Sequence, residues 1–89
     1  MSKLIPAAER IIKARELIQK ARDLPVPVEG GRGDFSYVAR VKDYLRQARD
    51  LVKFIPQSAS ASEELKEEVR KVFHEMEQAD QEILHLRGS

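Results

Sequence analysis

The C-terminal third of the chain carries the pattern that constrains the fold most. Apolar residues recur there at unbroken, alternating steps of four and three: Leu65, Val69, Val72, Met76, Ala79, Ile83 and Leu86. This spacing returns to one side of an α-helix at every turn, so it predicts an amphipathic helix over residues 61–86. Ser60 with Glu63 matches a capping box at its start, and Ser62 is an alternative N-cap. Such a helix needs partners that cover its apolar seam.

Two more amphipathic helices are predicted upstream. The first covers residues 6–24, with Pro6 in its first turn and a stripe of small and branched residues: Ala7, Ile11, Ala14, Ile18 and Ala21. The second covers residues 35–55, with Asp34 as N-cap and Pro56 marking its end. Its seam repeats every three or four residues and consists of Val38, Val41, Leu45, Ala48, Val52 and Ile55. Phe35 extends this seam at its start, and Tyr44, Leu51 and Phe54 widen it.

Three helices of similar length with short connections predict an all-α fold, an antiparallel three-helix bundle. Its 89 residues form a single domain, and we expect this domain to be a fragment of a longer protein. Ile12 lies off the first stripe, so it either meets a second neighbour or is exposed. Phe73 and Leu84 lie about a quarter turn from the third seam. They either close the third side of the bundle or form part of a groove for a partner.

The connection between the first two helices, residues 25–33, is long for a helical bundle. Pro25 and Pro27 favour extended backbone, and the following glycines allow the chain to reverse. Val26 and Val28 are placed to lie back across the bundle and cover one of its grooves. A phosphate-binding loop needs Lys with Ser or Thr after its last glycine, but Asp and Phe follow here.

The sequence offers no constellation suited to catalysis, so we expect no enzyme activity, no cofactor and no metal. It has no cysteine, and His74 and His85 are too far apart along a helix, at about 16 Å, to bind one metal ion. Acidic residues interrupt the cations of the second helix, which disfavours nucleic acid as a partner. No apolar run is long enough to span a bilayer, and the N-terminus lacks a secretory signal. These features favour an intracellular protein, cytoplasmic rather than nuclear.

Charge is unevenly distributed along the chain. Residues 58–89 carry eight Asp or Glu against four Lys or Arg, while residues 1–57 carry seven against twelve. Helices of opposite charge attract one another across a bundle. An acidic third helix also suits a basic partner segment. The sequence therefore predicts a protein or peptide partner for a chain that is a monomer or a weak dimer.

The seams also carry a family resemblance. The segments ELIQKARDL (residues 16–24) and EVRKVFHEMEQADQEI (residues 68–83) resemble the first and third helices of MIT (microtubule interacting and transport) domains. Between them, FSYVARVKDYLRQARDLV has a similar seam of small and large residues. The resemblance implies a non-catalytic module that binds the short tail of an ESCRT-III-type subunit in an interhelical groove. The candidate contacts on the third helix are then Met76, Glu77, Asp80 and Leu84.

A second resemblance leads to a different partner. The Asp34-Phe35 pair at the start of the second helix is similar to that of SRI-type domains, which bind the phosphorylated tail of RNA polymerase II. This resemblance implies a nuclear adaptor for an acidic or phosphorylated peptide. Its candidate basic face consists of Arg40, Arg46, Arg49 and Lys53. A third hypothesis is a purely structural segment that docks onto its own larger protein or dimerises.

Overall fold

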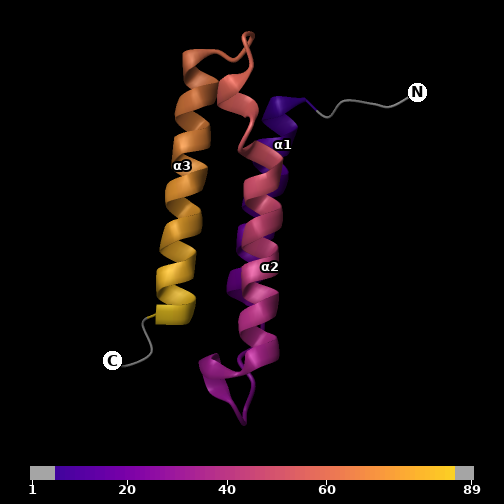
Figure 1. The fold of residues 1–89 in the computed structure, drawn as a ribbon, viewed down its shortest axis with the longest axis vertical. Coiled ribbons are helices and arrows are strands. Elements are labelled where there is room, and N and C mark those ends of the chain that lie inside the picture. The colour runs from indigo at the N-terminus through magenta and orange to yellow at the C-terminus, as the bar shows by residue number, and fades with distance from the viewer. Residues whose placement is uncertain (1–5, 86–89) are drawn as a thin grey trace, which may run out of the picture.

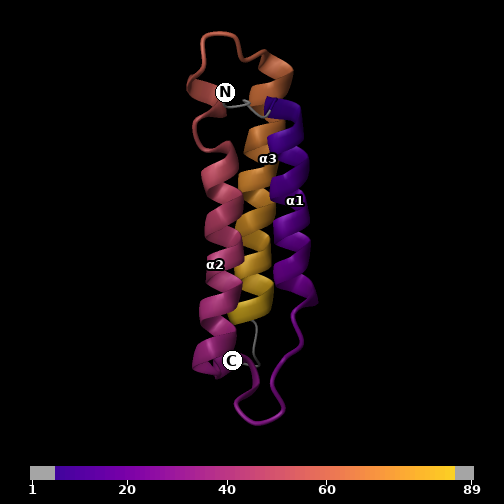
Figure 2. The same ribbon diagram turned by 90° about the vertical axis from the view of Figure 1, so that its right-hand side faces the viewer.

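The computed structural model describes residues 6–85 and consists of three helices joined by short turns. These are α1 (Ala7–Asp23), α2 (Phe35–Val52) and α3 (Glu63–Asp80), and α3 continues into a π-helical turn, η3 (Gln81–His85). α1 and α3 run in one direction and α2 runs against both (Figure 1, Figure 2). The predicted all-α antiparallel three-helix bundle is confirmed. Leu86, the last residue of the predicted seam, lies outside the described residues.

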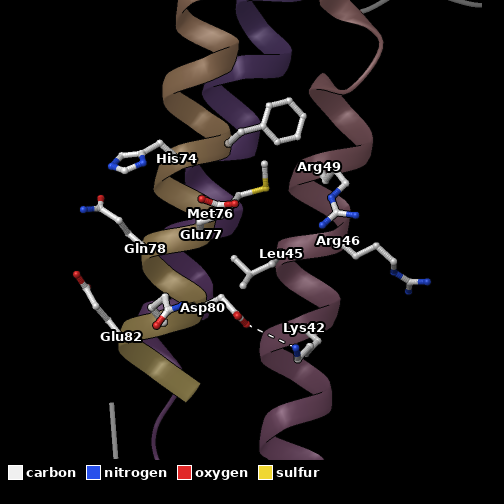
Figure 3. A pocket seen from close by; sticks show the side chains of 12 residues that line it. Lys42, Leu45, Arg46, Arg49, His74, Met76, Glu77, Gln78, Asp80 and Glu82 are labelled. Atoms are coloured by element: carbon white, nitrogen blue, oxygen red, sulfur yellow. Dashed lines mark ion pairs between the residues drawn. The ribbon is translucent and has the colours of Figure 1, made fainter. Parts of the chain in front are cut away.

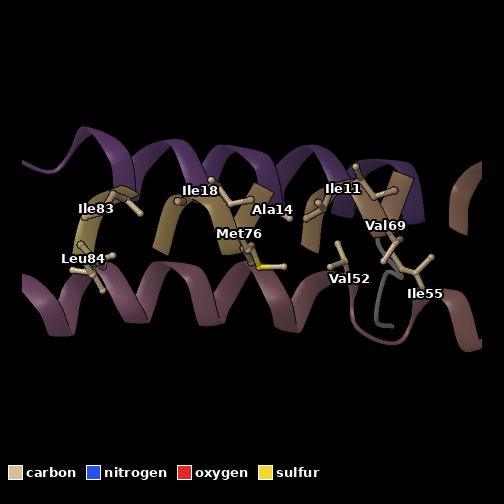
Figure 4. Close-up of a cluster of buried hydrophobic side chains, with 14 of the residues drawn as sticks. Ile11, Ala14, Ile18, Val52, Ile55, Val69, Met76, Ile83 and Leu84 are labelled. Carbon is tan, nitrogen blue, oxygen red and sulfur yellow. The ribbon is translucent and has the colours of Figure 1, made fainter. Parts of the chain in front are cut away.

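The core is built from the three predicted seams, which meet along the bundle axis (Figure 4). Each seam includes alanines with no exposed surface, Ala14 and Ala21 on α1, Ala48 on α2 and Ala79 on α3. Small side chains let neighbouring backbones approach closely. Branched residues and Met76 fill the spaces between them: Ile11, Ile18, Val41, Val52, Val69, Val72 and Ile83.

Side-chain caps set where α2 and α3 begin. The Asp34 carboxylate accepts a hydrogen bond from the Tyr37 amide at 2.9 Å, which confirms the predicted N-cap of α2. At α3 the alternative cap is the one used, because the Ser62 hydroxyl accepts from the Leu65 amide at 3.1 Å. Ser60 lies outside the helix, where its hydroxyl pairs with that of Ser58. The first choice for this cap, Ser60, is therefore wrong by two residues.

Two phenylalanines assigned to the α2 seam are exposed instead. Phe35 exposes 91% and Phe54 60% of its surface. From Val41 to Phe35 the pattern takes two successive steps of three, which turn the side chain about 120° away from the seam. Phe54 follows the end of α2, and the Lys53 ammonium lies 5.2 Å from the centre of its ring. Phe35 therefore leaves the seam through repeated steps of three, and Phe54 leaves it because the helix has ended.

The connection between α1 and α2 does not cover the bundle. Val28 is fully exposed and Val26 is 41% exposed, so the prediction that they lie back across a groove is wrong. The segment turns through η1 (Gly31–Gly33), where Gly31 adopts a positive φ of 58°. This turn lies next to η3 at the same end of the bundle.

Ile83 and Leu84 are both buried in the bundle at the end where η1 and η3 lie. They are adjacent in sequence, yet only 6% and 8% of their surfaces are exposed. Leu84 reaches toward α2 while Ile83 stays on the main seam (Figure 4). Of the two interpretations of Leu84, the structure supports the one that closes the bundle. Ile12 is 56% exposed, which settles its two alternatives in favour of exposure.

Candidate functional site

The seam between α1 and α3 is closed by a network of ion pairs. Arg15 on α1 donates from Nε and Nη2 to the two carboxylate oxygens of Glu75, at 3.1 and 3.2 Å, and from Nη1 to Glu68 at 3.0 Å. Arg22 donates to Glu82 at 2.6 Å. Hydrogen bonding to Arg15, with Lys71 nearby, lowers the pKa of Glu68. These contacts tie α1 to α3 along most of their length.

The seam between α2 and α3 is held together more loosely. Of the ion pairs between described residues, one joins these two helices, from the Lys42 ammonium to the Asp80 carboxylate at 3.6 Å. Next to this pair lies a groove of about 830 Å³ that opens between the two helices. Figure 3 views this groove from close by. A second hollow, of about 390 Å³, lies on α3 alone.

The floor of the groove is apolar. Leu45 from α2 and Phe73 and Met76 from α3 line it, and all three pack on or within the core. In Figure 3 the side chains of Leu45 and Met76 lie between the two helices. His74, Gln78 and Glu82 also border the groove, but they point away from α2 in the same view. The accessible apolar surface therefore lies along the α2–α3 seam itself.

The wall contributed by α2 is cationic. Lys42, Arg46 and Arg49 follow one another at steps of four and three, so they share one edge of the helix. Arg46 donates to Asp43 at 2.6 Å, and this bond, with a second from Gln47, lowers the pKa of Asp43. Arg49 makes no ion pair with any described residue. Its guanidinium is therefore available to a ligand.

The wall contributed by α3 is anionic. Glu77 and Asp80 line the groove opposite the cations of α2. Asp80 already pairs with Lys42, whereas Glu77 makes no ion pair within residues 6–85. The groove thus combines an apolar floor with two walls of opposite charge.

The predicted site residues fall into three groups. Met76, Glu77, Asp80, Arg46 and Arg49 all line the groove, so members of both candidate sites face each other across one cavity. Leu84 is buried in the core and is absent from the lining. Met76 is also 93% buried, so it contributes to the floor and not as a protruding anchor.

Two of the proposed cations of α2, Arg40 and Lys53, do not line the groove. Nine residues separate Arg40 from Arg49, which is about half a turn, so the two point to opposite sides of α2. Lys42 lines the groove although the candidate basic face left it out. Its spacing of four and seven residues from Arg46 and Arg49 is the sequence signal that places it on the same edge.

The described residues give no geometry for metal binding, because no three His, Asp or Glu side chains are grouped as ligands. No described helix is both long and apolar enough to cross a bilayer. Comparisons of the chain with protein-family models, with curated proteins and with solved structures found no match.

Proposed function

We propose that this chain is a non-catalytic interaction module that binds a short amphipathic helix of a partner protein in the α2–α3 groove. One observation carries the proposal: an apolar floor lies between a cationic wall on α2 and an anionic wall on α3. Amphipathic helices bind in this way, with apolar anchors in a groove and polar contacts at its rims.

The dimensions of the groove support a helical ligand. Its central residues run from 42 to 49 on α2 and from 73 to 80 on α3. Seven residues of helix correspond to about 10 Å, which is about two turns. A docked helix of two to three turns would therefore contact both walls along their whole length. Its apolar seam would meet Leu45, Phe73 and Met76.

This proposal is closest to the MIT-like alternative, in which a partner's tail occupies an interhelical groove. Acidic or phosphorylated peptides of the SRI type are less favoured, because Glu77 and Asp80 would repel them. The predicted basic face is also divided, since Arg40 points away from the groove. Dimerisation through this groove is the remaining alternative, and sedimentation at micromolar concentration distinguishes it, because a stable dimer would occupy the groove with a second copy.

The proposal can be tested by titrating the domain with a designed helical peptide while following backbone amide shifts. The probe is a peptide of about 14 residues, two heptads, with leucine on the seam and Glu and Lys on opposite flanks. We expect the largest shifts at Leu45, Phe73 and Met76, and none with a scrambled peptide of equal composition. Binding that shifts only α1, or no binding by either peptide, would refute the proposal.

A substitution in the floor provides a second test. Phe73 is half-buried at the rim of the core, and Phe73→Ala removes much of the apolar surface that a ligand would cover. We expect peptide affinity to fall about tenfold, as is usual for an aromatic contact at an interface. Phe54→Ala, an exposed phenylalanine outside the groove, is the matched control and should leave affinity unchanged. Circular dichroism checks that both variants remain helical.

A further inference from the structure

We infer that the groove also fixes the direction in which a bound ligand helix runs, according to the charges on the two flanks of that helix, because the two walls of the groove carry opposite charges. The inference rests on the proposed function and adds a rule for the ligand. One flank of the ligand's apolar seam must be acidic, to face α2, and the other must be basic, to face α3. A ligand with the same charge on both flanks would meet repulsion at one wall.

The handedness of the α-helix turns this rule into a direction. In heptad notation a and d form the seam, e follows d on one flank, and g precedes a on the other. On α1 the seam consists of Ile11, Ala14, Ile18 and Ala21, and the e positions are Arg15 and Arg22. Both arginines reach α3. A helix that runs parallel to α3 in the position of α1 therefore directs its e flank at α3.

α1 lies behind the α2–α3 pair in Figure 1, and the groove opens on the opposite side of this pair (Figure 3). A ligand helix in the groove that runs parallel to α3 has α2 and α3 on the opposite flanks from those on which α1 has them. Its e flank therefore faces α2 and its g flank faces α3. Acidic residues at e and basic residues at g then match both walls. A ligand with basic residues at e and acidic residues at g matches the two walls only when it runs parallel to α2.

The residues available for this recognition are central to the groove. Arg49 on the α2 wall and Glu77 on the α3 wall are exposed and make no ion pair with other described residues. Each can therefore pair with a ligand without losing an existing partner. Arg46 adds a second cation to the α2 wall, already paired with Asp43 on its own helix. The floor carries no charge, so it contributes to the affinity for a ligand helix but does not distinguish between its two orientations.

The experiment uses two peptides of about 14 residues with leucine at a and d and identical composition. One has Glu at every e and Lys at every g, and the other has the charges exchanged. Each carries a nitroxide at its N-terminus, which broadens nearby amide signals of the domain. We expect the first to broaden Phe73 and Arg49 and the second to broaden Lys42 and Asp80. Opposite directions for the two peptides support the inference.

The other outcomes separate the inference from the proposed function. If both peptides bind in the groove in one direction, the inference is overturned and the proposed function stands. If neither binds, both are overturned. A peptide with Glu on both flanks, or with Lys on both, should bind several-fold more weakly than either mixed peptide. Equal affinity for all four would also overturn the inference.

Charge reversal in the domain gives an independent measurement. The double substitution Arg49→Glu and Glu77→Arg exchanges the two charges that lack partners, and both side chains are exposed. We expect both mixed peptides to lose their fixed direction on this variant, because Arg49 and Glu77 are the unpaired charges that set it, so each nitroxide should broaden amides at both ends of the groove. Arg40→Glu reverses a charge on the opposite side of α2 and should leave the direction of both peptides unchanged. An unchanged direction on the double variant would show that these two charges do not orient the ligand.

Discussion

The valines of this chain allow one substitution to be compared at the two extremes of burial. Val52 has no exposed surface and packs where α2 meets the other two helices, whereas Val28 in the α1–α2 connection is fully exposed. Val→Ala removes the same two carbon atoms at both positions. Any difference in the free energy of unfolding therefore comes from the surroundings of the side chain.

The cost at Val52 follows from three contributions. Removing two buried carbons costs about 1.6 kcal/mol in lost burial of apolar surface. The cavity left in the core adds about 1 kcal/mol. Alanine is the better helix former, which returns up to about 0.6 kcal/mol. We expect Val52→Ala to lower the free energy of unfolding by about 2 kcal/mol, and hence the Tm by roughly 8–16 °C for a domain of this size.

Thermal and urea unfolding followed by circular dichroism measures both variants. Val28→Ala should change the free energy of unfolding by less than about 0.5 kcal/mol, as is usual for an exposed position. Val41, also without exposed surface, provides a replicate in the middle of α2. A loss above about 1 kcal/mol for Val28→Ala would mean that the connection does cover the bundle. A negligible loss for Val52→Ala would contradict the assigned core.

Three smaller effects should also be measurable by unfolding. Gly31→Ala should cost about 1 kcal/mol, because this glycine has a positive φ with open space around it, whereas Gly33→Ala should be nearly neutral. Ser62→Ala should cost about 1 kcal/mol through the lost N-cap of α3. The Arg15 guanidinium lowers the pKa of Glu68, so the folded state binds the proton of this carboxyl less readily than the unfolded state does. The resulting stabilisation is fully present above the unfolded pKa of about 4.3 and is lost as the pH falls through the lower, folded pKa. Arg15→Met should reduce the slope of stability against pH in that acidic range.

Much of the fold follows from the sequence because the seams of all three helices are nearly regular. The alternating steps of α3 predicted the burial of Val69, Val72, Met76 and Ala79, and Asp34 was placed correctly as a cap. Periodicity shows which side of a helix is apolar, and an apolar residue on that side is almost always buried in the core. The errors occur where this argument weakens, at helix ends and in the connection between α1 and α2.

The groove was harder to predict because it depends on which helix lies beside each flank. The sequence presents the acidic and basic candidates as separate sites, since the seam pattern does not say that the flanks of α2 and α3 meet. The overall basic character of the second helix groups Arg40 with the other cations, although its angular position excludes it. Assigning each charged residue to a heptad position places Lys42 and Arg49 at e and Arg46 at the adjoining b, which identifies this edge from sequence alone.

The same flank assignment bears on the handedness of the bundle. A third helix can pack on either side of an antiparallel pair, and the apolar seams fit both arrangements. In the observed one, the g flank of α3 faces α1, and it carries Glu68, Glu75 and Glu82 at intervals of seven residues. The e flank of α1 carries Arg15 and Arg22, which bind all three. The observed side thus matches anions with cations along the α1–α3 seam.

The mirror arrangement would place each flank against the wrong neighbour. The e flank of α1, with Arg15 and Arg22, would face Lys42 and Arg49 on α2, so that four cations would lie along one seam. We infer that these charges select the observed handedness, although each exposed pair contributes only about 0.2–1 kcal/mol. Reversing both α1 arginines to glutamate should shift the preference toward the mirror arrangement, and distances between spin labels on the flanks of α1 and α3 should then change. A single unchanged distance would mean that side-chain packing alone determines the handedness.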